Sequence, residues 1–72
     1  MDKLRAIQYF VVAVREGSLS GAARRLEVSV PAVAKLVAAL ERELAAKLFD
    51  RSPRGLALTA DGERYLAVCE GV

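Results

Sequence analysis

The chain has 72 residues, with 11 Lys and Arg against 9 Asp and Glu, a single Cys, and neither His nor Trp. This length allows one compact domain, and because so short a chain buries only about 60% of its unfolded surface, its core is marginal. With no His and only Cys69, the usual zinc clusters, a Ser-His-Asp triad and a Cys-His pair are excluded. We therefore expect no enzyme, no metal site and no cofactor.

Charge is distributed unevenly along the chain. Residues 1–36 carry six basic and three acidic side chains, whereas residues 37–72 carry five basic and six acidic ones, so that the formal charge of +2 combines +3 with −1. Arg51 and Arg54 are a basic pair within the acidic second half. This distribution is compatible with a nucleic-acid-binding face and does not establish one.

The N-terminus and the lone cysteine bear on location. One cysteine cannot form an internal disulfide, and Lys3 and Arg5 precede an amphipathic run, unlike the uniformly apolar run of a signal peptide. No uncharged stretch approaches the roughly 20 residues that a membrane span needs. We expect a cytoplasmic protein without membrane contact.

The first half of the chain predicts two helices separated by a glycine. An apolar stripe at helical spacing predicts the first helix, which Gly17 ends as a C-cap. The stripe consists of Leu4, Ile7, Phe10, Val11 and Val14. Ser18 is then a candidate N-cap for a short helix over Leu19 to Leu26, which packs through Ala22, Ala23 and Leu26.

A third helix follows over about residues 29–46, with Ser29 as N-cap and Pro31 in the first turn. Its inward stripe is Val33, Val37, Leu40 and Leu44, and its outward positions are Pro31, Ala34, Lys35, Ala38 and Arg42. Two short helices joined by a tight turn and held against a longer first one form the helix-turn-helix pattern.

The period then changes to two short strands, Leu48 to Arg51 and Leu56 to Thr59. Residues 52–55 between them carry Pro and Gly at the second and fourth positions, which is typical of a type I turn. A small hairpin after a helix-turn-helix is a wing, here residues 48–59. Thr59 then caps a last helix over residues 60–72, with an acidic first turn.

Six motifs, kept in order over nearly the whole chain, resemble the N-terminal region of LysR-type transcriptional regulators. They are Arg5 to Phe10, Gly17 to Leu26, Val28 to Val33, Leu40-Glu41 with Leu44, Leu48 to Arg51, and Leu58 to Gly62. The resemblance implies a mainly α, winged helix-turn-helix domain over residues 1–59 that binds operator DNA, and the start of a linker and dimerisation helix over 60–72. It also implies a homodimer, and a small-molecule effector that acts only through a further C-terminal domain.

The third helix suits the major groove because its outward N-terminal half is slim. Where the family commonly has Ser-Gln-Pro-Ala-Leu-Ser-Arg-Gln, residues 29–36 read Ser-Val-Pro-Ala-Val-Ala-Lys-Leu, so that Val30, Ala34 and Leu36 replace polar side chains. We expect this helix to contact thymine methyls and to use Lys35, and to discriminate only modestly between bases. DNA shape would supply much of the remaining specificity. The alternative is that an alanine-rich face reflects helix propensity alone.

The predicted DNA-binding residues lie on the second and third helices and the wing. They are Ser18, Arg24, Arg25, Ser29, Val30, Pro31, Ala32, Ala34, Lys35, Arg51 and Arg54. The two serines cap helices whose first N–H groups can reach phosphate, and at least one arginine of the second helix is expected to do so. Arg51 and Arg54 suit a phosphate ridge or the minor groove. The alternative for both is an ordinary solvated turn charge, and a second alternative for Arg51 is an ion pair with a carboxylate on a neighbouring helix.

The last helix carries an apolar stripe that we interpret as a dimer interface. It consists of Tyr65, Leu66, Cys69 and Val72. Pairing through it would place two recognition helices about 34–36 Å apart, and the alternative is that the stripe packs on the first helix of its own domain, either instead of pairing or in addition to it. The alternative function is a winged-helix protein-interaction module without DNA readout.

Overall fold

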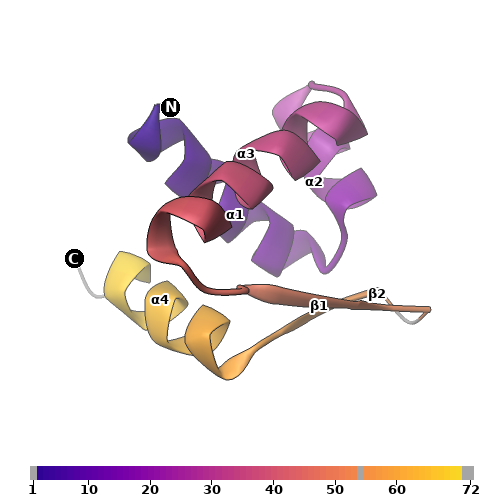
Figure 1. Cartoon of the computed structure of the whole chain (residues 1–72). Coiled ribbons are helices and arrows are strands. Elements are labelled where there is room, and N and C mark those ends of the chain that lie inside the picture. Colours follow the sequence, from indigo (N-terminus) through magenta and orange to yellow (C-terminus); the bar gives the residue numbers. More distant parts are fainter. Residues whose placement is uncertain (1, 54, 71–72) are drawn as a thin grey trace.

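The computed structural model describes residues 2–53 and 55–70, within which four helices and a hairpin follow one another (Figure 1). The elements are α1 (Lys3–Glu16), α2 (Leu19–Leu26), α3 (Val30–Leu44), β1 (Phe49–Ser52), β2 (Gly55–Leu58) and α4 (Ala60–Glu70). The first three helices pack on one another, the hairpin projects from one side of them, and α4 lies beneath. The predicted mainly α, winged helix-turn-helix fold is confirmed.

Short side chains begin the first two helices. The Asp2 carboxylate accepts the N–H of Arg5 at 3.2 Å, a cap that the apolar stripe did not predict, so that α1 begins at Lys3. Gly17 ends α1 in the left-handed conformation (φ 73°), as predicted. The Ser18 hydroxyl accepts the N–H of Gly21 at 2.9 Å, and α2 has its predicted bounds.

The start of α3 was predicted correctly and its end was not. The Ser29 hydroxyl accepts the N–H of Ala32 at 3.2 Å, as expected of an N-cap. The helix ends at Leu44 rather than at residue 46, because Ala45 adopts a left-handed conformation (φ 53°) and turns the chain back. The N–H of Ala46 then bonds to the carbonyl oxygen of Glu41 at 3.1 Å, which closes the end of the helix.

Each strand of the wing lies one residue nearer the tip of the hairpin than predicted. The strands are antiparallel and pair from Phe49 with Leu58 at the base to Ser52 with Gly55 at the tip. Leu48 lies outside β1 because its N–H bonds to the Glu41 carboxylate, and Thr59 lies outside β2 because its side chain begins α4. The predicted type I turn includes Arg54, which lies outside the described residues.

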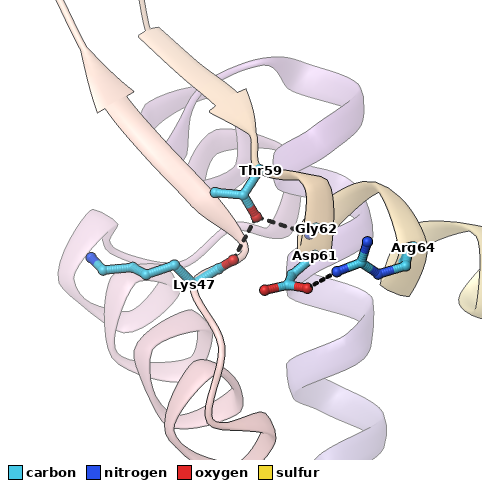
Figure 2. Close-up of polar contacts among 5 residues, drawn as sticks. All are labelled: Lys47, Thr59, Asp61, Gly62 and Arg64. Carbon is cyan, nitrogen blue, oxygen red and sulfur yellow. Dashed lines mark hydrogen bonds and ion pairs between the residues drawn. The ribbon is translucent and has the colours of Figure 1, made fainter.

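One threonine joins the wing to α4 (Figure 2). The Thr59 hydroxyl donates to the carbonyl oxygen of Lys47 at 2.5 Å and accepts the N–H of Gly62 at 2.9 Å, which confirms the predicted cap. A Cβ on Gly62 would overlap the carbonyl oxygen of Leu48, so α4 approaches the base of the wing as closely as it does because residue 62 has no side chain. Asp61 and Arg64 form an exposed ion pair on the next turn of α4.

A single core joins the helices, the wing and α4. Its largest fully buried side chains are Phe10, Leu40, Leu48 and Val33. The Phe10 ring of α1 lies 5.3 Å from the Phe49 ring of β1 and 5.6 Å from the Tyr65 ring of α4, measured between centroids. Tyr9 of α1 is also buried in this core. The wing and α4 are therefore packed against the three-helix unit and not merely tethered to it.

Candidate nucleic-acid interface

The N-terminal half of α3 presents a row of exposed and half-buried side chains to solvent. Val30 is 40% exposed, Pro31 and Lys35 are exposed, and Ala32 and Ala34 are half-buried. The predicted inward stripe faces the other way: Val33, Val37 and Leu40 are buried, and Leu44 is half-buried at the end of the helix. This face is small and carries one cation, which is the shape that a groove of DNA admits.

The last turn of α2 carries two exposed cations. Arg24 and Arg25 make no ion pair with another described residue, so both guanidinium groups are available to an external anion. They lie directly before the turn that leads into α3. In a helix-turn-helix the first helix crosses the DNA backbone, which places cations at this position near phosphates.

The two predicted serines are occupied as helix caps. Ser18 is half-buried and Ser29 is exposed, and each hydroxyl accepts a backbone N–H of its own helix. A hydroxyl that accepts one bond still has its hydrogen to donate. Their capping role is confirmed, and a contact with phosphate stays a prediction.

The wing is held by a residue that the sequence did not single out for any role. The Glu41 carboxylate of α3 accepts the N–H of Leu48 at 2.8 Å and that of Phe49 at 3.4 Å. Leu56 of β2 also donates to the carbonyl oxygen of Gly17 at 3.4 Å. No local sequence pattern predicts such contacts, because they depend on how the chain reverses after α3. The predicted sites on the wing, Arg54 and the side chain of Arg51, lie outside what the structure describes.

The predicted dimer stripe on α4 packs on its own domain. Tyr65, Leu66 and Cys69 are half-buried against the core, as the alternative interpretation expected, and Val72 lies outside the described residues. Burial raises the pKa of the Tyr65 hydroxyl and that of the Cys69 thiol. Val68, a large apolar side chain of α4, is instead exposed, at 64%.

Val68 borders a shallow groove of about 230 Å³ between the end of α3 and α4. The groove is lined by Leu44, Ala46, Leu48, Asp61, Arg64, Tyr65 and Val68. The assignment of Tyr65, Leu66 and Cys69 to a dimer interface stays a prediction.

The part of the chain that the structure describes holds neither a cluster of metal ligands nor a helix able to span a membrane. Within residues 2–53 and 55–70, Cys, Asp and Glu side chains nowhere gather in threes around a space for a metal ion. Over the same ranges, every helix is too short or too polar to cross a membrane.

Comparison with known proteins identifies the family. The model of the lysR family of bacterial regulatory helix-turn-helix proteins matches residues 4–63. The chain belongs to the LysR family. Among its curated LysR-type relatives, the transcriptional regulator TfdS of Cupriavidus pinatubonensis is 45% identical over 64 residues, which are 89% of this chain and 22% of TfdS. The transcriptional activator AaeR of Escherichia coli is 39% identical over 69 residues, or 96% of this chain and 22% of AaeR.

Solved LysR-family structures share the fold. The DNA-binding domain of CbnR, in complex with DNA, superposes with a TM-score of 0.88 at 37% identity, covering 93% of this chain and 77% of that one. The BenM DNA-binding domain, in complex with benA site 1 DNA, superposes with a TM-score of 0.90 at 31% identity, covering 99% and 81%. The chain thus spans most of these isolated domains and about a fifth of the curated relatives.

Proposed function

We propose that this chain is the DNA-binding domain of a LysR-type transcriptional regulator and binds double-stranded DNA sequence-specifically. The N-terminal half of α3 would enter the major groove, with the wing at the backbone or the minor groove. The observation that carries the proposal is the exposed start of α3, where Val30, Pro31 and Lys35 face solvent. The LysR-family domains of CbnR and BenM, which share this fold, were solved with DNA.

Each part of the surface has a proposed role. Base contacts come from the N-terminal half of α3, with Val30 and Ala34 against thymine methyls and Lys35 as the one cation. Arg24 and Arg25 neutralise phosphates next to α2. On the sequence alone, Arg51 and Arg54 of the wing are proposed to contact phosphates or the minor groove.

The larger protein is also part of the proposal. Residues 1–59 would form the DNA-binding domain, and residues 60–72 the start of a linker helix through which two copies pair. A small-molecule effector would act through a further domain of a longer protein. A regulator of bacterial transcription binds the chromosome, so the proposed location is the cytoplasm. Its relatives are named as transcriptional regulators, and no catalytic activity is proposed.

The test is the salt dependence of duplex binding. Each neutralised phosphate adds about −0.9 to the slope of log affinity against log salt, so three or more contacts predict a slope of about −3 or steeper. Replacing Arg24 and Arg25 together with Ala should reduce the steepness by about 1 to 2 and weaken binding to all sequences. The control is Arg64→Ala, which removes a cation of α4 and should leave the slope unchanged.

The same titration separates the alternative function. A flat salt response, together with tight binding to a protein partner, would contradict the proposal and favour the interaction module. Base-specific readout is tested by selecting a preferred duplex from a random pool and replacing its thymines with uracils. Loss of affinity at methyl positions under α3 is expected, and an unchanged affinity at every one of them would contradict the assigned role of Val30 and Ala34.

A further inference from the structure

We propose that Glu41 is a positioning residue for DNA binding, whose carboxylate sets the position of the wing relative to the recognition helix α3. The inference rests on the proposed function, in which α3 and the wing contact one duplex. Two elements that bind the same rigid ligand must keep a defined spacing, because otherwise the duplex has to order one of them as it binds.

Glu41 accepts hydrogen bonds from several backbone N–H groups of the chain reversal that leads from α3 into the wing. Its carboxylate oxygen Oε2 accepts the N–H of Leu48 at 2.8 Å and the N–H of Phe49 at 3.4 Å. Its own carbonyl oxygen accepts the N–H of Ala46 at 3.1 Å. One residue of the last turn of α3 thus holds residues 46–49, the segment that leads into the wing.

The bond to Leu48 has no ready substitute. Leu48 is 1% exposed, so water has little access to its backbone, and a buried N–H without a partner is costly. Bonds to an ionised carboxylate are also stronger than those to a neutral acceptor. Without Glu41, the start of β1 is expected to shift until the N–H of Leu48 finds another acceptor.

Other contacts hold the wing to different elements. The Thr59 hydroxyl ties its base to α4, and the N–H of Leu56 reaches the α1–α2 corner at Gly17. Among the described residues, the polar side-chain link between the wing and α3 is that of Glu41. A carboxylate near a DNA-binding surface opposes binding through its charge, so its place here is explained by the backbone groups that it holds.

Hydrogen exchange of the 72-residue chain tests the link without DNA. Glu41→Ala should speed the exchange of the Leu48 amide at least tenfold, and Glu41→Gln, which keeps a carbonyl oxygen at the same place, should speed it less. The matched control is Glu43→Ala, which removes a carboxylate from the same turn. Glu43 lies 3.7 Å from the exposed Lys3 ammonium and has no contact with the wing among the described hydrogen bonds. An unchanged Leu48 exchange rate in Glu41→Ala would overturn the proposal.

Duplex binding then tests the consequence. Binding of a labelled random-sequence duplex is compared between Glu41→Ala and Glu43→Ala, since each variant lacks one negative charge of the parent chain. Glu41→Ala should bind about 3- to 10-fold more weakly than Glu43→Ala, with a salt slope shallower by about 1 because wing contacts with phosphate are lost. Glu41→Gln should recover much of the affinity.

The outcomes distinguish this inference from the proposed function. If the parent chain does not bind the duplex, the proposed function fails whatever the exchange data show. If the parent binds and the two alanine variants bind equally with equal slopes, Glu41 has no positioning role. Circular dichroism fixes a temperature at which each variant is folded. A binding deficit of Glu41→Ala that disappears there would assign Glu41 to stability alone and overturn the inference.

Discussion

At the scale of single residues, two described residues that are not glycine adopt the left-handed backbone conformation and end a helix. Within residues 2–53 and 55–70, Glu27 and Ala45 have positive φ angles of 58° and 53° and end α2 and α3. The left-handed conformation costs an L-residue roughly 1–2 kcal/mol because its Cβ crowds a carbonyl oxygen. The sequence predicted the end of α1 at Gly17 correctly and that of α3 two residues too late, since alanine gives no signal to stop.

Ala45→Gly should therefore stabilise the domain. Glycine removes the Cβ crowding at φ 53° and gives back part of the gain as unfolded-state entropy, for an expected net rise of about 0.5–1 kcal/mol in the free energy of unfolding. Urea denaturation measures it. Ala46→Gly is the control, because Ala46 lacks a positive φ and its replacement should bring no gain. An Ala45→Gly variant less stable than the parent would contradict the argument.

At the scale of elements, each junction depends on a small number of polar side chains. The hydroxyls of Ser18 and Ser29 begin α2 and α3, and each acts on an N–H three residues ahead. Local bonds of this kind are visible in a sequence, and both were predicted. Thr59 was predicted as a cap as well, but its second bond, to the carbonyl oxygen of Lys47 twelve residues earlier, was not.

Thr59→Val tests the junction between the wing and α4. Valine keeps the shape of threonine but removes the hydroxyl, so that the cap at Gly62 and the bond to Lys47 are both lost. The expected cost is about 2 kcal/mol of unfolding free energy. Thr59→Ser keeps the hydroxyl and should cost less than about 1 kcal/mol. Thermal and urea unfolding measure both, and equal losses in the two variants would show that the hydroxyl is unimportant.

At the scale of the whole molecule, α4 completes the core from the end of the chain. Tyr65 and Cys69 pack against the core, where the Tyr65 ring meets that of Phe10 in α1, and burial is the main cause that raises the pKa of both groups. A raised pKa in the folded state means that the unfolded chain loses its proton first as the pH rises. The folded state is then favoured at low pH and loses this advantage at high pH.

The free energy of unfolding should therefore be level near neutral pH and fall as the pH passes about 9, where an ordinary thiol ionises. Urea denaturation between about pH 7 and 10 measures this profile. Cys69→Ala removes the thiol and should make the decline smaller. A stability that rises over this range would contradict the packing of α4 against the core.

The distribution of charge also depends on the whole fold. The net charge of +2 does not by itself indicate a binding partner, but the fold places Arg24, Arg25 and Lys35 on the exposed parts of the helix-turn-helix. The contact of these residues with DNA stays a prediction. The outward placement of Pro31 and Lys35 on α3 could be predicted, since helical periodicity says which positions of a helix face outward. The position of the wing could not, because it depends on Glu41 reaching across a chain reversal.

The sequence by itself determined the family, the order of the elements and the start of each helix after α1. Caps and helical periodicity act over three or four residues, and the family motifs follow one another in a fixed order, so all of them can be read along the chain. The tertiary structure decided three other features: where α3 ends, how the wing is held against it, and that the stripe of α4 packs on its own domain. The first depends on the left-handed conformation of Ala45, which an alanine does not indicate, and the other two depend on contacts between elements that meet only when the core forms.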